Sequence, residues 1–160
     1  MTENLNILAP EIFLSLSVFS ILMIGVFLKD SYKTFLKLSI ISLLISIILI
    51  MNGENNSQKI FLNSFMRDPF TDFIKILILI SSIFILNTSQ LFVKENNLSK
   101  FEYPIIIMLS ILGMFFMVSS NDIILFYLGL ELQSLSLYIL AAIDRDNIRS
   151  TEAGIKYFVL

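Results

Sequence analysis

Long apolar stretches dominate the chain, and each is about as long as a membrane-spanning helix. Five can be placed by hydropathy, at about residues 7–28, 35–51, 70–92, 104–118 and 123–142, and a further helix-competent segment covers 151–160. An α-helix rises about 1.5 Å per residue, so about 20 residues cross a hydrocarbon core about 30 Å thick. The pattern predicts an all-α, polytopic transmembrane protein with five helices and the start of a sixth.

The polar positions between these stretches predict how the helices are connected. The one long connection, residues 52–68, contains apolar residues that indicate a short segment lying against the membrane surface: Phe61, Leu62, Phe65 and Met66. Asp122 directly precedes the fifth helix and is expected to cap it. Within the second helix, small hydroxyl residues fall on one side and suit close helix packing: Ser39, Ser42 and Ser46.

The basic residues favour one side of the predicted helices. Two of them, Lys59 and Arg67, lie in the long connection, whereas seven lie in connections on the opposite side. Because Lys and Arg concentrate in cytoplasmic loops, this asymmetry predicts an N-terminus on the outside of the membrane. The seven are Lys29, Lys33, Lys37, Lys94, Lys100, Arg145 and Arg149.

The fifth predicted helix has a polar stripe on an otherwise apolar surface. Glu131 stands near its middle, and Tyr127, Ser134 and Tyr138 lie at i−4, i+3 and i+7, so the four share one face. An ionisable side chain at this depth costs at least about 3 kcal/mol, which makes Glu131 a candidate functional residue. The three hydroxyls are supporting polar residues, and we expect the stripe to form a buried polar pocket.

Composition supports the membrane interpretation and excludes several functions. Hydrophobic residues make up 56% of the chain and charged residues 15%, against about 25% charged residues in soluble domains. The net charge of −2 and the absence of a basic cluster argue against nucleic-acid binding. With no Cys and no His, the chain offers no disulfide, no iron–sulfur ligation and no ordinary metal or haem site. We therefore expect no redox centre on this chain.

Two segments carry a resemblance to a known family. They are EYPIIIMLSILGMFFMVSSNDIILFYLGLELQSLSLYILAA at 102–142 and STEAGIKYFVL at 150–160, while PEIF at 10–13 and DPFTDFIKIL at 68–77 match more loosely. The chain resembles subunit 2 of respiratory complex I, whose bacterial equivalent is subunit N of the NADH–quinone oxidoreductase. The resemblance implies an antiporter-like membrane subunit with fourteen helices in two inverted five-helix repeats. In that plan, residues 1–160 are the N-terminal membrane portion.

The resemblance also implies roles and partners. Glu131 matches the family's intramembrane glutamate and Lys156 the lysine at the start of the sixth helix, so both are expected to act in proton translocation. The whole subunit would contribute to proton translocation coupled to electron transfer from NADH to ubiquinone. No cofactor is expected on this chain, because NADH, FMN, iron–sulfur clusters and quinone would lie on other subunits. The expected partners are other complex I membrane subunits, the lipid bilayer and the C-terminal remainder of the subunit, in the same or a separate chain.

Simpler structural roles stay open for Glu131 and Lys156. Glu131 would then tie helices together by hydrogen bonds without exchanging protons. Desolvation favours the neutral acid whereas a nearby cation favours the carboxylate, and such opposed effects are typical of a group that changes protonation. Lys156 has Glu152 at i−4, so an ordinary ion pair within one helix explains it as well.

Two other charged residues of the predicted helices are given structural roles. Lys75 has Asp72 at i−3 and lies about a turn and a half into its helix, so we expect a paired or snorkelling lysine. Glu11, at the edge of the first helix, is expected to interact with the helix dipole or the membrane interface.

Two alternative functions and two locations follow from the same residues. The chain could be a subunit of a multi-subunit cation/proton antiporter or a passive membrane scaffold. The apolar residues up to Leu160, without a polar tail, suggest the first part of a longer protein or one piece of a split one. Ile, Phe, Asn and Lys are abundant and are encoded by AT-rich codons, which suggests a mitochondrial or a reduced bacterial genome. We expect the mitochondrial inner membrane, with the bacterial cytoplasmic membrane as the alternative.

Overall fold

A bundle of long helices forms the protein in the computed structural model, which describes residues 7–27, 32–53, 57–95 and 101–159. Each predicted helix is present, with ends close to the predicted residues. Five of them are long and apolar enough to cross a membrane, which confirms the helical membrane fold. The helices are α2 (Ala9–Phe27), α3 (Tyr32–Met51), α4 (Pro69–Glu95), α5 (Glu102–Ser119), α6 (Ile123–Ala141) and the shorter α7 (Ile148–Val159).

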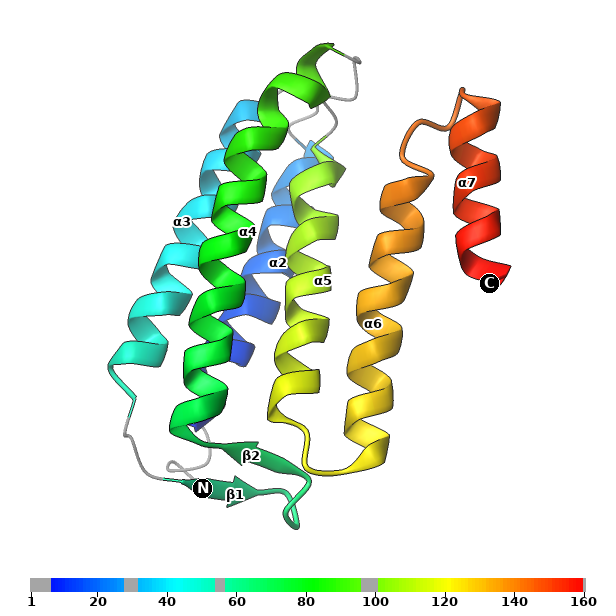
Figure 1. Cartoon of the computed structure of the whole chain (residues 1–160). Helices are drawn as coiled ribbons and strands as arrows, with labels where there is room; N and C mark the ends of the chain where they lie inside the picture. The colour runs from blue at the N-terminus through cyan, green and yellow to red at the C-terminus, as the bar shows by residue number, and fades with distance from the viewer. Residues whose placement is uncertain (1–6, 28–31, 54–56, 96–100, 160) are drawn as a thin grey trace.

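Helix α5 is the centre of the bundle. It packs against α2, α3 and α4 on one side and against α6 on the other. Figure 1 shows α6 and α7 on the far side of α5 from α3 and α4. Within the most apolar 18 residues of α5, 56% of the residues are buried inside the bundle, whereas the corresponding share in α6 is 11%. Helix α6 therefore presents most of its surface outward.

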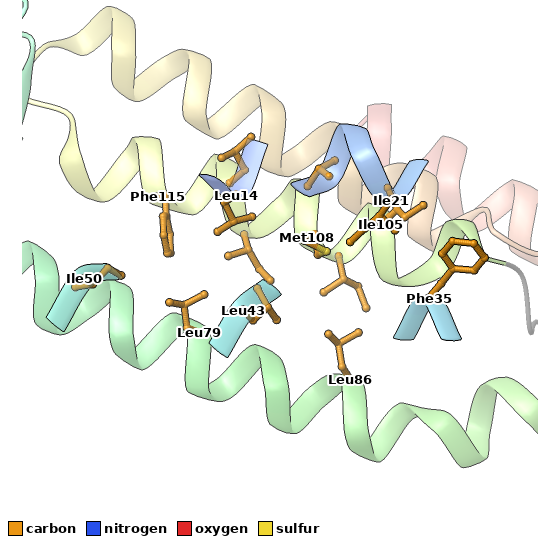
Figure 2. Packing of buried hydrophobic residues seen from close by; sticks show 14 residues of the cluster. Leu14, Ile21, Phe35, Leu43, Ile50, Leu79, Leu86, Ile105, Met108 and Phe115 are labelled. Carbon is orange, nitrogen blue, oxygen red and sulfur yellow. The ribbon is translucent and has the colours of Figure 1, made fainter. Parts of the chain in front are cut away.

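Apolar side chains from four helices fill the space between α2, α3, α4 and α5. Figure 2 shows this core, which includes Leu14, Leu43, Leu79, Met108 and Phe115. The small-residue face of α3 is confirmed, because Ser39, Ser42 and Ser46 are all buried. Their hydroxyls donate to backbone carbonyls about one turn earlier in α3, and the Ser42 hydroxyl also lies 3.8 Å from the Met108 sulfur of α5.

The long connection folds into a β-hairpin rather than a simple surface segment. Strands β1 (Gln58–Ile60) and β2 (Phe65–Arg67) pair antiparallel, with Ile60 opposite Phe65. Phe65 was expected at the membrane surface, but it is buried against the bundle, whereas Leu62 at the tip is 102% exposed. The expectation was therefore wrong for Phe65, because alternate residues of a strand point to opposite faces.

The hairpin is held against the turn between α5 and α6. The Asn121 backbone N–H donates to the Ser64 carbonyl at 2.9 Å, and the Asn121 side-chain amide donates to the Asn63 carbonyl at 2.8 Å. Asp122 occupies the N-cap position of α6, but its side chain makes no capping hydrogen bond, so that expectation was also wrong. The hairpin thus covers one end of the bundle.

The alternating helices sort the connections to two ends of the bundle. Figure 1 shows the hairpin, the α5–α6 turn and the starts of α2 and α4 at one end. The start of α3, the end of α4 and the α6–α7 turn lie at the other. This is the arrangement on which the charge asymmetry depends, although Lys29 and Lys100 fall outside the described residues. The orientation in the membrane stays a prediction.

Candidate functional site

A close crossing of α5 and α6 sets the position of Glu131. A Cβ atom added at Gly129 would lie 2.8 Å from the Met117 backbone nitrogen and 2.9 Å from the Gly113 carbonyl oxygen. One added at Gly113 would lie 2.6 Å from the Gln133 backbone nitrogen. Glycine permits this approach because it has no side chain, as in other membrane helix pairs. Glu131 follows Gly129 by two residues, so the crossing fixes its height in the bundle.

The face of α6 that carries Glu131 turns away from α5. Gly129 and Ser136 are the buried residues of α6, whereas Glu131 is partly buried and Tyr127 is 57% exposed. The Tyr127 hydroxyl interacts with the Glu131 carboxylate, and the Ser134 hydroxyl donates to the Glu131 backbone carbonyl at 3.1 Å. Within the described part of the chain, the stripe is an open polar surface and not the enclosed pocket we expected.

Tyr138 joins α6 to α7. Its ring meets the Tyr157 ring edge-on at 4.9 Å between centroids and the Phe158 ring at 5.6 Å. Edge-to-face pairs of this kind stabilise by about 0.5–1.5 kcal/mol beyond the area they bury. Tyr138 shares the face of Glu131 by its position, and its ring packs against the next helix.

Lys156 lies in α7 as one half of an ion pair within the helix. Its Nζ is 2.6 Å from Glu152 Oε1, four residues earlier, and the side chains are 68% and 56% exposed. This is the simpler arrangement considered from the sequence. Among the described residues, the structure shows no ion pair between Glu131 and Lys156. It therefore brings Glu131 together with Tyr127, and not with Lys156.

A second ionisable pair, which we did not predict from the sequence, lies under the hairpin. Lys75 Nζ contacts Glu11 Oε1 at 2.5 Å, and the two side chains are 0% and 1% exposed. The structure corrects both sequence interpretations, because Lys75 neither snorkels nor pairs with Asp72, and Glu11 is buried inside the bundle. The lysine ammonium also lies 5.4 Å from the Phe65 ring centroid and 5.7 Å from that of Phe115, within cation–π range.

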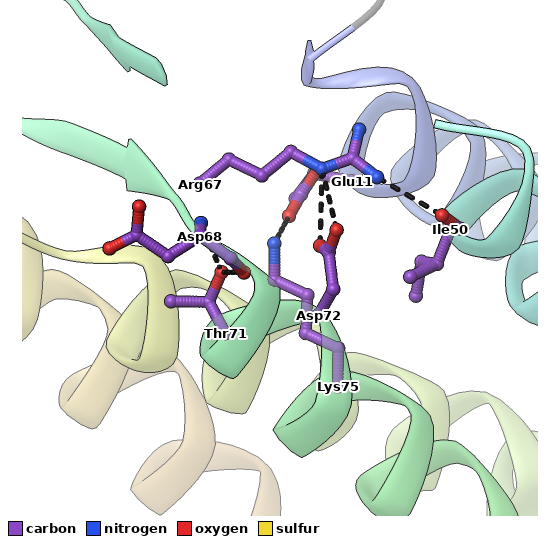
Figure 3. Close-up of polar contacts among 7 residues, drawn as sticks. All are labelled: Glu11, Ile50, Arg67, Asp68, Thr71, Asp72 and Lys75. Carbon is purple, nitrogen blue, oxygen red and sulfur yellow. Dashed lines mark hydrogen bonds and ion pairs between the residues drawn. The ribbon is translucent and has the colours of Figure 1, made fainter. Parts of the chain in front are cut away.

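Asp72 has a different partner, the buried Arg67 of strand β2. Arg67 Nε lies 3.1 and 3.0 Å from the two carboxylate oxygens of Asp72, and Nη2 donates to the Ile50 carbonyl at 3.1 Å. Figure 3 shows both ion pairs, Arg67 with Asp72 and Lys75 with Glu11, between α2, the start of α4 and β2. Arg67 therefore joins the hairpin to α3 and α4, and it leaves Lys75 free to pair with Glu11.

One signal in the sequence points to the missed pair. A lysine about 9 Å from the start of an apolar helix, at 1.5 Å per residue, needs a carboxylate or a route to water. Besides Asp72, a candidate carboxylate is Glu11, which lies close to the start of the first predicted helix. Glu11 belongs to the segment PEIF, one of the segments that carry the family resemblance. No group of three or more His, Cys, Asp or Glu residues that could hold a metal occurs among the described residues.

Comparison with known proteins gives this geometry a family context. A family model described as NADH:quinone oxidoreductase/Mrp antiporter, TM, matches residues 120–160, which contain the whole of α6. NADH-quinone oxidoreductase subunit N of Pelagibacter ubique is 45% identical over 159 residues, and that of Parvibaculum lavamentivorans is 46% identical over 153 residues. The chain is a homologue of these subunits N. The resemblance read from the sequence is thereby confirmed.

The relatives are much longer than this chain. The two alignments cover 99% and 94% of the chain but 34% and 32% of the relatives, so the chain spans about a third of their length. A chain of respiratory complex I from Thermus thermophilus with bound aureothin has a similar fold, with a TM-score of 0.77. At 18% identity, over 94% of this chain and 32% of that one, it supports the fold alone. The named relatives are bacterial, so the mitochondrial location has no support among them.

Proposed function

We propose that this chain forms part of a membrane-arm subunit of a proton-translocating NADH–quinone oxidoreductase in a bacterial cytoplasmic membrane. The observation that carries the proposal is the 45% identity with a subunit N across nearly the whole chain. NADH, FMN, iron–sulfur clusters and quinone would be bound by other subunits, since this chain has no Cys or His to ligate a metal centre. The N-terminus and the hairpin would face the outside, because the connections at the other end carry most of the basic residues.

Glu131 is the residue that we propose to hold and pass on the proton. It lies halfway along α6, partly buried, with the Tyr127 hydroxyl at its carboxylate. In an apolar surrounding the neutral acid is favoured, and a cation that comes close favours the carboxylate. A neighbouring cation that moves would therefore load and unload the proton.

The open face of α6 would be covered in the assembly by the part of the subunit that corresponds to the rest of the relatives' length, or by another membrane subunit. An isolated polar stripe in contact with lipid would be costly, and such groups in membrane helices face protein or water. Ser134 and Tyr138 would support the proton path from the same face. Lys156 is the second proposed proton-path residue, and its exposed pair with Glu152 would have to exchange partners for this role.

The test uses the purified oxidoreductase in vesicles, with proton uptake measured against NADH oxidation. Glu131→Gln keeps the shape of the side chain and loses the titratable group, so we expect an assembled complex that translocates fewer protons per NADH. Glu102→Gln is the control, because it makes the same change in an exposed pair with Arg145 at the end of the bundle. Glu131→Ala should be worse, since it also leaves the Tyr127 hydroxyl without its partner.

Three outcomes would contradict the proposal. A normal proton ratio in Glu131→Gln, together with failed assembly in Glu131→Ala, would make Glu131 a structural residue. Proton movement driven by a sodium or potassium gradient without NADH would favour the cation/proton antiporter, which the description of the matching family also names. A complex that pumps fully without this chain would favour the passive scaffold.

A further inference from the structure

The buried pair of Glu11 and Lys75 is arranged differently from an ion pair that only joins two helices. Such a pair holds both of its charges by several hydrogen bonds, because each charge has lost its contact with water. Among the described residues, the lysine ammonium makes one hydrogen bond, which it donates to Glu11 Oε1. The second carboxylate oxygen, Glu11 Oε2, is buried and has no hydrogen-bond partner among the described residues. That oxygen is free to take a proton.

The surroundings of Lys75 suit a partner that is sometimes neutral. The rings of Phe65 and Phe115 lie on the ammonium, and a cation over an aromatic face is attracted by the ring. These two contacts do not depend on the protonation of Glu11. The lysine therefore keeps favourable neighbours when the carboxylate is neutralised, and it stabilises the carboxylate when the proton leaves.

Two of the other charged groups near the pair neutralise each other. Arg67 on β2 and Asp72 on α4 form their own ion pair, with side chains 5% and 13% exposed. Figure 3 shows the Asp68 carboxylate turned away from Lys75. From α5 the pair meets the uncharged Phe115. One turn later in α5, the buried hydroxyl of Ser119 also has no hydrogen-bond partner among the described residues. The polar groups thus extend from the pair toward the hairpin end of the bundle.

We propose that Glu11 and Lys75 form a second proton site, at the hairpin end of the bundle, in addition to Glu131. A hydronium ion from the aqueous phase at that end gives its proton to Glu11 Oε2. One O–H bond forms on the carboxyl group, one O–H bond of the hydronium breaks, and a water molecule leaves. Lys75 remains an ammonium on Oε1 throughout, and release reverses the step. This inference rests on the proposed function, because a proton site of this kind serves a proton-translocating protein.

The first experiment uses the wild-type chain in the assembled oxidoreductase and so avoids any folding defect. An apolar carbodiimide enters the membrane and reacts with protonated carboxyl groups to give a stable N-acylurea, which mass spectrometry assigns to a residue. We expect modification of Glu11 that decreases as the pH rises. No modification of Glu11 at any pH would overturn the proposal, because a permanently charged carboxylate does not react.

The second experiment compares proton translocation per NADH in Glu11→Gln, Lys75→Met and the double variant. Each single change leaves one buried charge without its partner, so assembly is expected to fall in both. The double variant has no buried charge left, and we expect it to assemble and to translocate fewer protons per NADH than the wild type. Glu102→Gln, in the exposed pair with Arg145, is the control and should behave as the wild type.

The two experiments separate this inference from the role of Glu131. A double variant with the wild-type proton ratio would overturn the second site, since the pair would then only join α2 to α4. If the double variant does not assemble, the carbodiimide result on the wild type decides alone. A lower proton ratio in Glu131→Gln together with a wild-type ratio in the double variant refutes only the second site. A wild-type ratio in Glu131→Gln together with a lower ratio in the double variant refutes only the role of Glu131.

Discussion

The crossing of α5 and α6 predicts that larger side chains at Gly129 destabilise the protein more, because the contact distances show how little space lies between the two backbones. A Cβ at Gly129 would meet backbone atoms of α5 at 2.8 and 2.9 Å, about 0.6 Å closer than ordinary contact at 3.4 Å. Backbone atoms cannot turn aside as a side chain can. Gly129→Ala must therefore push the two helices apart, and Gly129→Leu must push them further.

The expected cost follows from two opposing terms. Overpacking a tightly packed contact costs about 1–3 kcal/mol, and more for a larger side chain. Replacing Gly by Ala within a helix returns at most about 1 kcal/mol of helix propensity. The balance is a net loss of up to about 2 kcal/mol for Gly129→Ala and a larger loss for Gly129→Leu. Since 1 kcal/mol changes the melting temperature of a chain of this size by about 2–4 °C, the alanine variant should melt up to about 8 °C lower.

The assay is thermal unfolding of the detergent-solubilised assembly, with the fraction of this chain that stays soluble measured at each temperature. Leu128→Ala is the control, because Leu128 is the adjacent residue of α6, about 100° around the helix from Gly129, and is 59% exposed. The order of melting temperatures should be wild type, then alanine, then leucine. A leucine variant that melts at or above the wild-type temperature would show that α5 and α6 do not approach as closely as described.

Two further predictions concern the topology in the membrane and the strength of the two lysine ion pairs. Leu62→Cys at the hairpin tip and Arg149→Cys at the start of α7 should react with a membrane-impermeant maleimide from opposite sides of the membrane. Labelling of both from the same side would refute the topology. The natural chain has no Cys that could react in their place. Lys75→Met, which leaves Glu11 buried without its partner, should destabilise the chain by about 3–5 kcal/mol. Lys156→Met, in the exposed pair, should cost no more than about 1 kcal/mol; similar melting temperatures for these two variants would count against the burial of the Glu11–Lys75 pair.

The helices could be predicted from the sequence because each apolar stretch is a local property of the chain. The packing face of α3 was also predictable, since Ser39, Ser42 and Ser46 lie one turn apart and must share a side. The hairpin was not predictable in the same way. Its strands have three residues each, too few to show an alternating pattern. The burial of Phe65 depends on the α5–α6 turn, which lies far along the chain.

The pairing of the charges under the hairpin shows where local reasoning fails. The sequence contains two cations and three carboxylates close to the starts of α2 and α4, so it suggests a group of ion pairs: Glu11, Arg67, Asp68, Asp72 and Lys75. Spacing along one helix favours Lys75 with Asp72 at i−3. Arg67 Nε lies within hydrogen-bond distance of both oxygens of Asp72, however, while Nη2 donates to the Ile50 carbonyl, since a guanidinium has several donors that can hold two partners at once.

Because Arg67 holds Asp72 and the Asp68 carboxylate is turned away from Lys75, Lys75 pairs with Glu11. The two residues are 64 positions apart, and no helical or strand period connects them. Their contact requires the side chains of α2 and α4 to meet across the hairpin end of the bundle, which is a property of the assembled fold. The fold, and not the local sequence, therefore keeps this lysine and this carboxylate together out of water. Because the pair connects α2 to α4 beneath the hairpin, a change of protonation at Glu11 would act directly on the contact between these two helices and the hairpin.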